Sequence, residues 1–140
     1  MKVLAVAEAK AVGGRNGHSE ASDKSVAVDL SIPKSMGGPG RPGTTTPEHL
    51  FAVGYSACFG SALDYVASQK KVAIPGASVS AKVSLLQRDD GGFRLGVELI
   101  VGIPGLDKSV AESLVAAAHQ VCPYSHATRN NIDVKLSTVV

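Results

Sequence analysis

Two cysteines, Cys58 and Cys122, are the residues of this sequence best suited to chemistry. Cys58 lies among alanine, serine, glycine and aromatic residues, where a thiol usually packs as a small apolar side chain. Because such burial raises the pKa of a thiol, a reactive Cys58 requires a nearby cation. Arg15, in a glycine-rich turn, is the candidate. Cys122 directly precedes Pro123 and is expected at a helix N-terminus, where free backbone N–H groups favour a thiolate.

Other kinds of site fit the sequence less well. The glycine-rich stretch 37–46 lacks the Lys-Ser/Thr pair of a phosphate-binding loop. Ser56 stands in a partial nucleophile-elbow motif, but it falls inside an expected helix, where its hydroxyl should bond a backbone carbonyl. The four histidines form no zinc-binding spacing with the cysteines, although His119 and Cys122 are three residues apart. We therefore expect no metal and no resident cofactor.

The composition is that of one globular domain spanning residues 1–140, with 44% hydrophobic and 19% charged residues. A net charge of +2 and the absence of tryptophan argue against a nucleic-acid partner. The apolar run 3–7 is too short for a signal peptide, and we find no run of about 18 apolar residues, so no membrane span is expected. The expected location is the cytoplasm, where a thiol pair is more often chemical than structural.

Periodicity predicts an α+β fold with a mainly antiparallel sheet. The expected strands are residues 2–12, 25–32, both arms of a hairpin over 77–103, and 132–140. The turn 13–17 should join the first two strands, and residues 33–47, rich in glycine and proline, should form a long loop. A helix is expected over 106–121 with Asp107 as its N-cap, and Pro123 should end it and allow a short further turn.

The helix expected to begin after Thr46 is unusually apolar. Thr46 is a good N-cap, Pro47 suits the first helical position, and Glu48 places an acid in the first turn. From 49 to 63 the chain carries no formally charged side chain. A helix that is apolar around most of its circumference must be buried on most sides, which one chain of this size can hardly provide. We therefore expect burial against a partner subunit.

Three motifs, GGRNG, PEHLFAVGYSACFGSAL and VCPYSHATRNNI, resemble in order and spacing the organic hydroperoxide resistance proteins. These form one branch of the superfamily that includes osmotically inducible protein C (OsmC), and Arg15 favours this branch. The likeness covers essentially the whole chain. It implies an OsmC-like fold with a long central helix, in an intertwined homodimer whose active sites lie at the interface.

The resemblance also implies a thiol-dependent peroxidase that reduces organic hydroperoxides, including those of fatty acids, to alcohols. The peroxidatic cysteine of the family matches Cys58, and its resolving cysteine matches Cys122. The arginine of the family matches Arg15, and the glutamate paired with it matches Glu48. Its electron donors are external dithiols, in particular lipoylated proteins, and it uses no metal or haem.

The expected mechanism begins with a Cys58 thiolate held by Arg15 and oxidised by the peroxide to a sulfenic acid. Cys122 then condenses with it to a disulfide, which a dithiol reduces. Three aromatic residues are expected to wall the pocket: Phe51, Tyr55 and Phe59. Such walls favour alkyl hydroperoxides over hydrogen peroxide, since each buried CH₂ contributes roughly 0.8 kcal/mol.

Glu48 and Cys58 are ten residues apart on one expected helix, which separates them by about 15 Å. A Glu48 that orients Arg15 beside Cys58 must therefore come from the partner chain, which predicts a composite active site.

Two other function classes stay open from the residues alone. One is a redox-sensing or ligand-binding protein that uses the same thiols without turnover, and the other is a structural domain whose cysteines only pack. Relatives commonly carry Asn and Gln where this chain has Thr46 and His49, which bears on substrate preference.

Overall fold

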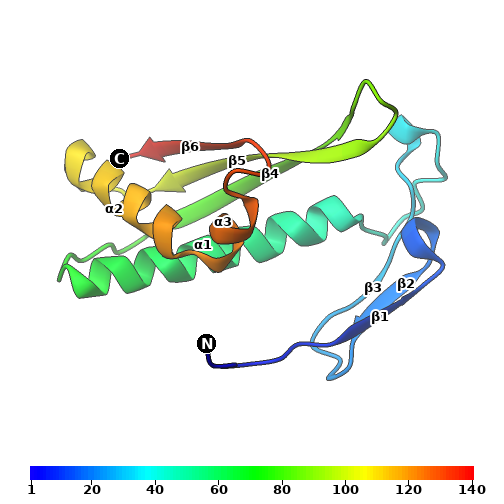
Figure 1. Ribbon diagram of the computed structural model, residues 1–140, viewed down its shortest axis with the longest axis horizontal. Coiled ribbons are helices and arrows are strands. Elements are labelled where there is room, and N and C mark those ends of the chain that lie inside the picture. The colour runs from blue at the N-terminus through cyan, green and yellow to red at the C-terminus, as the bar shows by residue number, and fades with distance from the viewer. The chain divides into compact units, whose positions relative to one another are not determined.

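The computed structural model describes all 140 residues and divides into two compact units, Met1–Leu50 and Phe51–Val140. We describe each unit by itself (Figure 1). The predicted α+β class is confirmed, with two three-stranded sheets and one long apolar helix, α1 (Pro47–Gln69). The expectation of a single domain stays a prediction.

The first unit is built on an antiparallel sheet in the order β1-β2-β3. Its strands are β1 (Ala9–Val12), β2 (His18–Ala21) and β3 (Ala27–Asp29), and its short 3-10 helices are η1 (Gly14–Asn16) and η2 (Lys34–Met36). Two expectations were wrong here. The turn 13–17 joins β1 to β2, a strand that we did not predict, and the regular strand within 25–32 is confined to β3. Leu30 adds only an isolated bridge to Thr45.

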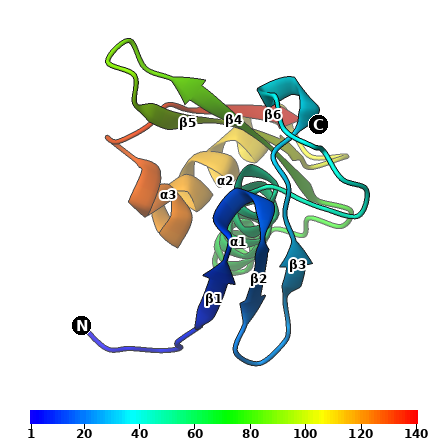
Figure 2. The ribbon, with the colours of Figure 1, turned by 90° about the vertical axis from the view of Figure 1, so that its right-hand side faces the viewer.

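The second unit has a mixed sheet in the order β4-β5-β6. The predicted hairpin is confirmed as β4 (Ser78–Gln87) and β5 (Phe93–Gly102), and β6 (Val134–Val139) pairs with β5 in parallel. The helices α2 (Lys108–Val121) and α3 (Pro123–Thr128) follow the prediction, and Asp107 caps α2 by accepting from two backbone N–H groups. Within this unit, all three helices lie on one face of the sheet (Figures 1 and 2).

The core of the second unit lies between that sheet face and the helices. Alternate residues of β5 are buried because successive side chains of a strand point to opposite faces. The largest fully buried side chains of the unit, apart from Cys122 and Ser125, are Tyr55, Phe59, Leu63, Leu99, Val101, Ile103 and Leu114. This packing fixes α1 against β5 and α2, and so determines where Cys58 can lie.

The opposite side of α1 has no partner in a single chain. Val53, Ala57, Ser61 and Tyr65, each four residues from the next, are all exposed, and Val53 is 69% exposed. By length and composition alone, α1 is long and apolar enough to cross a membrane, because glycine, serine and alanine interrupt its apolar run without making it polar. The expectation that no segment spans a membrane stays a prediction. A core helix passes the same test, and α1 supplies a large part of this core.

Candidate active site

The two cysteines meet in the second unit. Their Sγ atoms lie 3.5 Å apart, and both are free thiols. Cys58 is partly buried in the middle of α1, and Cys122 is completely buried between α2 and α3. Small side-chain rotations would join sulfurs at this separation, because a disulfide needs about 2.05 Å. The arrangement therefore permits a disulfide between residues distant in sequence.

Cys122 owes its position to the proline that follows it. Pro123 disfavours helical geometry at the preceding residue, and Cys122 accordingly has an extended backbone with ψ of 123°. Its N–H still donates to the carbonyl of Ala118, and its carbonyl accepts from His126 at 2.9 Å. Cys122 is thus the C-cap of α2 and the N-cap of α3, and both helices hold its backbone.

Cys58 is not activated by the second unit. Burial raises the pKa of its thiol, and contact with Cys122 raises it further, while a hydrogen bond from the backbone of Tyr124 lowers it. Burial is the largest of these effects. Because the net shift is upward, Cys58 is a protonated thiol at neutral pH unless a positive group is supplied from elsewhere.

In the first unit, Arg15 and Glu48 form a two-pronged ion pair, with Nη1 to Oε2 at 2.8 Å and Nη2 to Oε1 at 2.5 Å. Two parallel hydrogen bonds of this kind fix the orientation of the Arg15 guanidinium and strengthen the ion pair. The bond to Arg15 lowers the pKa of Glu48 more than burial raises it. Glu48 stands in the first turn of α1, where the Thr46 hydroxyl accepts the His49 N–H and caps the helix, as predicted.

The turn that carries Arg15 depends on glycine at both ends. Gly13 has φ of 81°, in the left-handed region that glycine adopts without strain. A Cβ added at Gly17 would lie 1.8 Å from the carbonyl oxygen of Val12, so no other residue fits there. Any substitution at Gly17 would therefore displace the turn and the Arg15 side chain with it.

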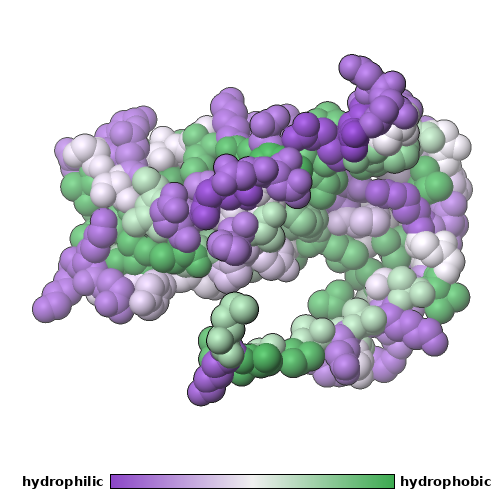
Figure 3. All heavy atoms as spheres, in the orientation of Figure 1, coloured by the Kyte–Doolittle hydropathy of each residue, from purple (hydrophilic) through white to green (hydrophobic).

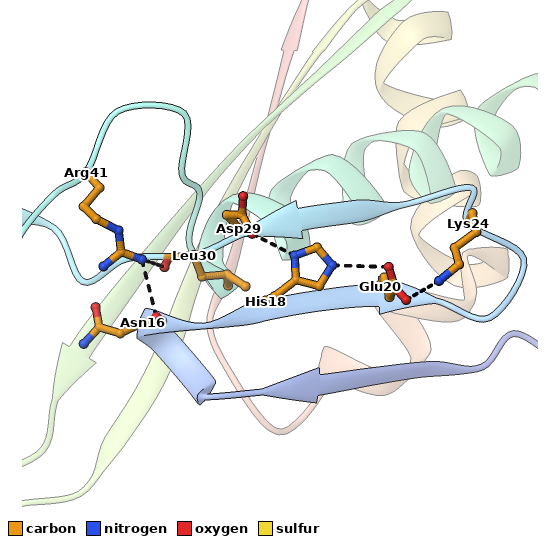
Figure 4. Close-up of polar contacts among 7 residues, drawn as sticks. All are labelled: Asn16, His18, Glu20, Lys24, Asp29, Leu30 and Arg41. Carbon is orange, nitrogen blue, oxygen red and sulfur yellow. Dashed lines mark hydrogen bonds and ion pairs between the residues drawn. The ribbon is translucent and has the colours of Figure 1, made fainter.

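A second arginine ties this turn to the long loop 33–46. Arg41 donates to the carbonyl of Leu30 at 2.9 Å and to that of Asn16 at 3.4 Å (Figure 4). The Asn16 side chain accepts from the N–H of Ile32 at 3.0 Å. The residue next to Arg15 is thus held by both its side chain and its backbone.

His18 and three charged residues form an exposed row on the same sheet (Figure 4). The His18 ring lies between Asp29, at 2.8 Å, and Glu20, which also pairs with Lys24. Hydrogen bonding to Asp29, and then to Glu20, raises the pKa of His18. Because the row is exposed, it contributes little to stability.

A cavity of about 380 Å³ opens in the second unit. Its lining is largely apolar and consists of Phe51, Leu95, Tyr124, Ala127, Thr128, Asn131 and Ile132. Of the three predicted pocket residues, only Phe51 lines this cavity, whereas Tyr55 and Phe59 are fully buried in the core. The rings of Phe51 and Tyr55 pack edge to face with centroids 5.9 Å apart.

Tyr124 is the site residue that sequence reasoning missed. Its ring packs 6.1 Å from that of Phe51, and its backbone donates to the Cys58 thiol. Gly54 permits this approach, since a Cβ there would lie 3.0 Å from the Tyr124 hydroxyl. The sequence feature that could have identified Tyr124 is its place two residues after Cys122 in the second cysteine motif. No three side chains of metal-ligating types come together anywhere in the chain.

Comparison with known proteins places these features in a family. Residues 38–137 match the model of the OsmC-like protein family. The organic hydroperoxide resistance protein of Xanthomonas axonopodis pv. citri is 50% identical over 137 residues, which cover 97% of this chain and 95% of that protein.

Two crystal structures extend the comparison. An organic hydroperoxide resistance protein OsmC from Legionella pneumophila is 50% identical, with a TM-score of 0.94 over 99% of this chain and 100% of that one. A putative organic hydroperoxide resistance protein from Vibrio cholerae, with captopril bound in one of its active sites, is 47% identical, with a TM-score of 0.92 over 99% of this chain and 94% of that one. The chain therefore belongs to the organic hydroperoxide resistance proteins of the OsmC-like family.

Proposed function

We propose that this protein is a thiol peroxidase that reduces organic hydroperoxides to alcohols and so defends the cell against peroxide stress. The single observation that carries the proposal is the 3.5 Å separation of the Cys58 and Cys122 sulfurs. Two thiols this close can give up two electrons and two protons to form a disulfide, and reduction of the disulfide restores both thiols. The names of the relatives support a role in resistance to organic hydroperoxides.

The proposed cycle has three steps. The Cys58 thiolate attacks the distal oxygen of the hydroperoxide, the O–O bond breaks, and the alkoxide leaves as an alcohol after taking up a proton. The resulting sulfenic acid condenses with the Cys122 thiol, forming the disulfide and releasing water. A dithiol then reduces the disulfide by two exchanges and is itself oxidised to a cyclic disulfide.

The cation in this proposal is Arg15 of a second subunit. Arg15 pairs with Glu48 of its own chain, and Glu48 precedes Cys58 on α1 by about 15 Å of helical rise. An Arg15 held by Glu48 therefore suits Cys58 of the partner subunit better than Cys58 of its own chain. There it would lower the pKa of the thiol that burial has raised.

A homodimer also accounts for exposed apolar surface in each unit. The outward side of α1 exposes Val53 and Tyr65, and the N-terminal segment exposes Val3, Leu4 and Val6. Figure 3 shows apolar residues along that N-terminal segment. Surfaces of this kind on a globular protein commonly mark an interface with another chain.

The proposed substrates carry an alkyl or fatty-acyl chain. The cavity beside Phe51 and Tyr124 is largely apolar, and hydrogen peroxide has no methylene groups to bury in it. The putative organic hydroperoxide resistance protein from Vibrio cholerae has captopril bound in one of its active sites, which supports access of an organic molecule to such a site.

Because Cys122 is completely buried and Cys58 only partly so, we propose that the reducing dithiol, free or on a lipoylated protein, attacks the Cys58 sulfur. The proposed location is the cytoplasm.

The test is steady-state consumption of cumene hydroperoxide with dihydrolipoamide as the only reductant. Many turnovers per subunit support the enzyme, and Cys58→Ser should abolish them. Cys122→Ser should permit one rapid turnover and then lose activity as Cys58 overoxidises. Wild-type protein that consumes one equivalent and stops would identify a redox sensor. Undiminished consumption by Cys58→Ser would show that the cysteine only packs.

A further inference from the structure

A chain of buried hydroxyl groups connects the helices that carry the two cysteines. The Ser125 hydroxyl lies 2.9 Å from the Tyr55 hydroxyl and 2.9 Å from Nδ1 of His119. The Tyr55 hydroxyl also lies 3.0 Å from that of Thr128. Tyr55 and Ser125 are fully buried. None of these polar groups takes part in the proposed cycle. A buried hydroxyl without a hydrogen-bond partner costs free energy of folding, so these groups must bond to one another.

Three members of this network, Tyr55, His119 and Ser125, stand one helical turn from a cysteine. Tyr55 precedes Cys58 by three residues on α1, and His119 precedes Cys122 by three on α2. Ser125 follows Cys122 by three residues in α3. Because residues three apart on a helix share a face, the network lies on the same side of each helix as the sulfurs. Ser125 therefore hydrogen-bonds to the residue one turn before each cysteine, Tyr55 on α1 and His119 on α2.

The hydrogen-bond inventory fixes the direction of the network. Thr128 donates its only hydroxyl proton to the Ser125 carbonyl at 3.3 Å, so it must accept from Tyr55. Tyr55 has then used its proton and accepts from the Ser125 hydroxyl, which in turn accepts from Nδ1–H of His119. Each of the three hydroxyl protons is then donated once. Burial, and then the charge of Arg129, lowers the pKa of His119, in agreement with a neutral ring carrying its proton at Nδ1.

We propose that Ser125 is a positioning residue that sets the effective concentration of the Cys122 thiol at Cys58, an inference that rests on the disulfide cycle proposed above. The Cys58 sulfenic acid has two fates. It condenses with Cys122 and releases water, or a second hydroperoxide oxidises it to a sulfinic acid and leaves as an alcohol. By holding α1 against the corner of α2 and α3, the network favours condensation. It protects the enzyme from overoxidation without touching the peroxide.

The first test needs no peroxide. Reduced protein is equilibrated with glutathione buffers, in which glutathione disulfide takes the two thiol hydrogens, becomes two glutathione molecules and leaves the protein disulfide. The variants are Tyr55→Phe, which keeps the ring and its packing, and Ser125→Ala, with Ser113→Ala on the exposed side of α2 as the matched control. Each of the first two removes two hydrogen bonds of the network and should lower the effective concentration at least about five- to tenfold, the factor expected for one lost hydrogen bond. The double variant should lower it by less than the product, because the two hydroxyls share one bond.

The second test is the partition of products after one equivalent of cumene hydroperoxide. Tyr55→Phe should yield more Cys58 sulfinic acid and less disulfide than the control, while the first-turnover rate of peroxide loss stays at the wild-type value. Should Ser125→Ala fail to fold, Tyr55→Phe decides the question alone. A Tyr55→Phe protein with the effective concentration and product partition of the control overturns the positioning role. A wild-type protein that forms no disulfide in either test overturns the proposed function instead.

Discussion

Gly54 and Gly60 provide a matched pair of substitutions on α1. Replacing glycine by alanine in a helix interior stabilises the helix by about 1 kcal/mol. A Cβ at Gly60 would meet only Cγ2 of Val79, at 3.9 Å, which is ordinary van der Waals contact. We therefore expect Gly60→Ala to raise the free energy of unfolding by about 1 kcal/mol.

The same change at Gly54 meets the ring of Tyr124. The new Cβ would lie 3.0 Å from the hydroxyl oxygen and 3.1 Å from Cε2, closer than such atoms normally pack. The ring is 40% exposed and can turn away, but leaving its rotamer costs roughly 0.5–1.5 kcal/mol. This cost offsets the gain in helix propensity, so Gly54→Ala should change the free energy of unfolding by less than about 0.5 kcal/mol.

The displaced ring should also change the thiol. The Tyr124 backbone donates to Cys58 and lowers the pKa of that thiol. The part of the clash that rotation of the ring does not relieve pushes the Tyr124 backbone away from Cys58 and weakens the bond. The pKa of Cys58 should therefore rise in Gly54→Ala and stay unchanged in Gly60→Ala.

Urea unfolding of the reduced proteins, at equal concentrations, gives the two stabilities. The rate of Cys58 alkylation by iodoacetamide as a function of pH, in a Cys122→Ser background, gives the pKa values. If both substitutions stabilise equally and leave the alkylation profile unchanged, Tyr124 does not pack on Gly54 in the way described.

Three further predictions concern charge and capping. Arg15→Ala should shift the pH profile of Cys58 alkylation to higher pH, because no cation then offsets the rise that burial gives to the thiol pKa; an unchanged profile removes Arg15 from the mechanism. The contribution of His119 to stability should fall as the pH drops below about 6.5, since the pKa of His119 is lower in the folded than in the unfolded chain, which therefore binds the proton first. Urea unfolding of His119→Gln beside the wild-type protein should lack this part of the slope. Asp107→Ala should lower the free energy of unfolding by about 1 kcal/mol by removing the α2 cap, whereas Ser113→Ala should have little effect in the same assay.

The sequence predicted the elements whose signals are local. Alternation over the hairpin, the Asp107 cap and Pro123 each fix backbone geometry without help from distant residues. β2 was missed because His18–Ala21 has almost no apolar alternation, and its strand geometry comes from pairing with β1 and β3 on both sides. The parallel direction of β6 was also beyond reach, since periodicity says nothing about which way a strand runs.

The candidate site divides in the same way. Burial of Cys58 and the upward shift of its pKa follow from its apolar neighbours, and both were predictable. The meeting of Cys58 with Cys122 was expected only from the family resemblance, because it depends on how two helices pack. Tyr124 and the Ser125 network depend on close approaches between distant segments, which no sequence pattern records.

The most direct test of the proposed chemistry is the mass spectrum of the reduced protein after one equivalent of an organic hydroperoxide. We expect loss of two hydrogen atoms and a peptide in which Cys58 is linked to Cys122 of the same chain. A stable sulfinic acid on Cys58 with Cys122 still a free thiol would contradict it, as would a disulfide that joins two subunits.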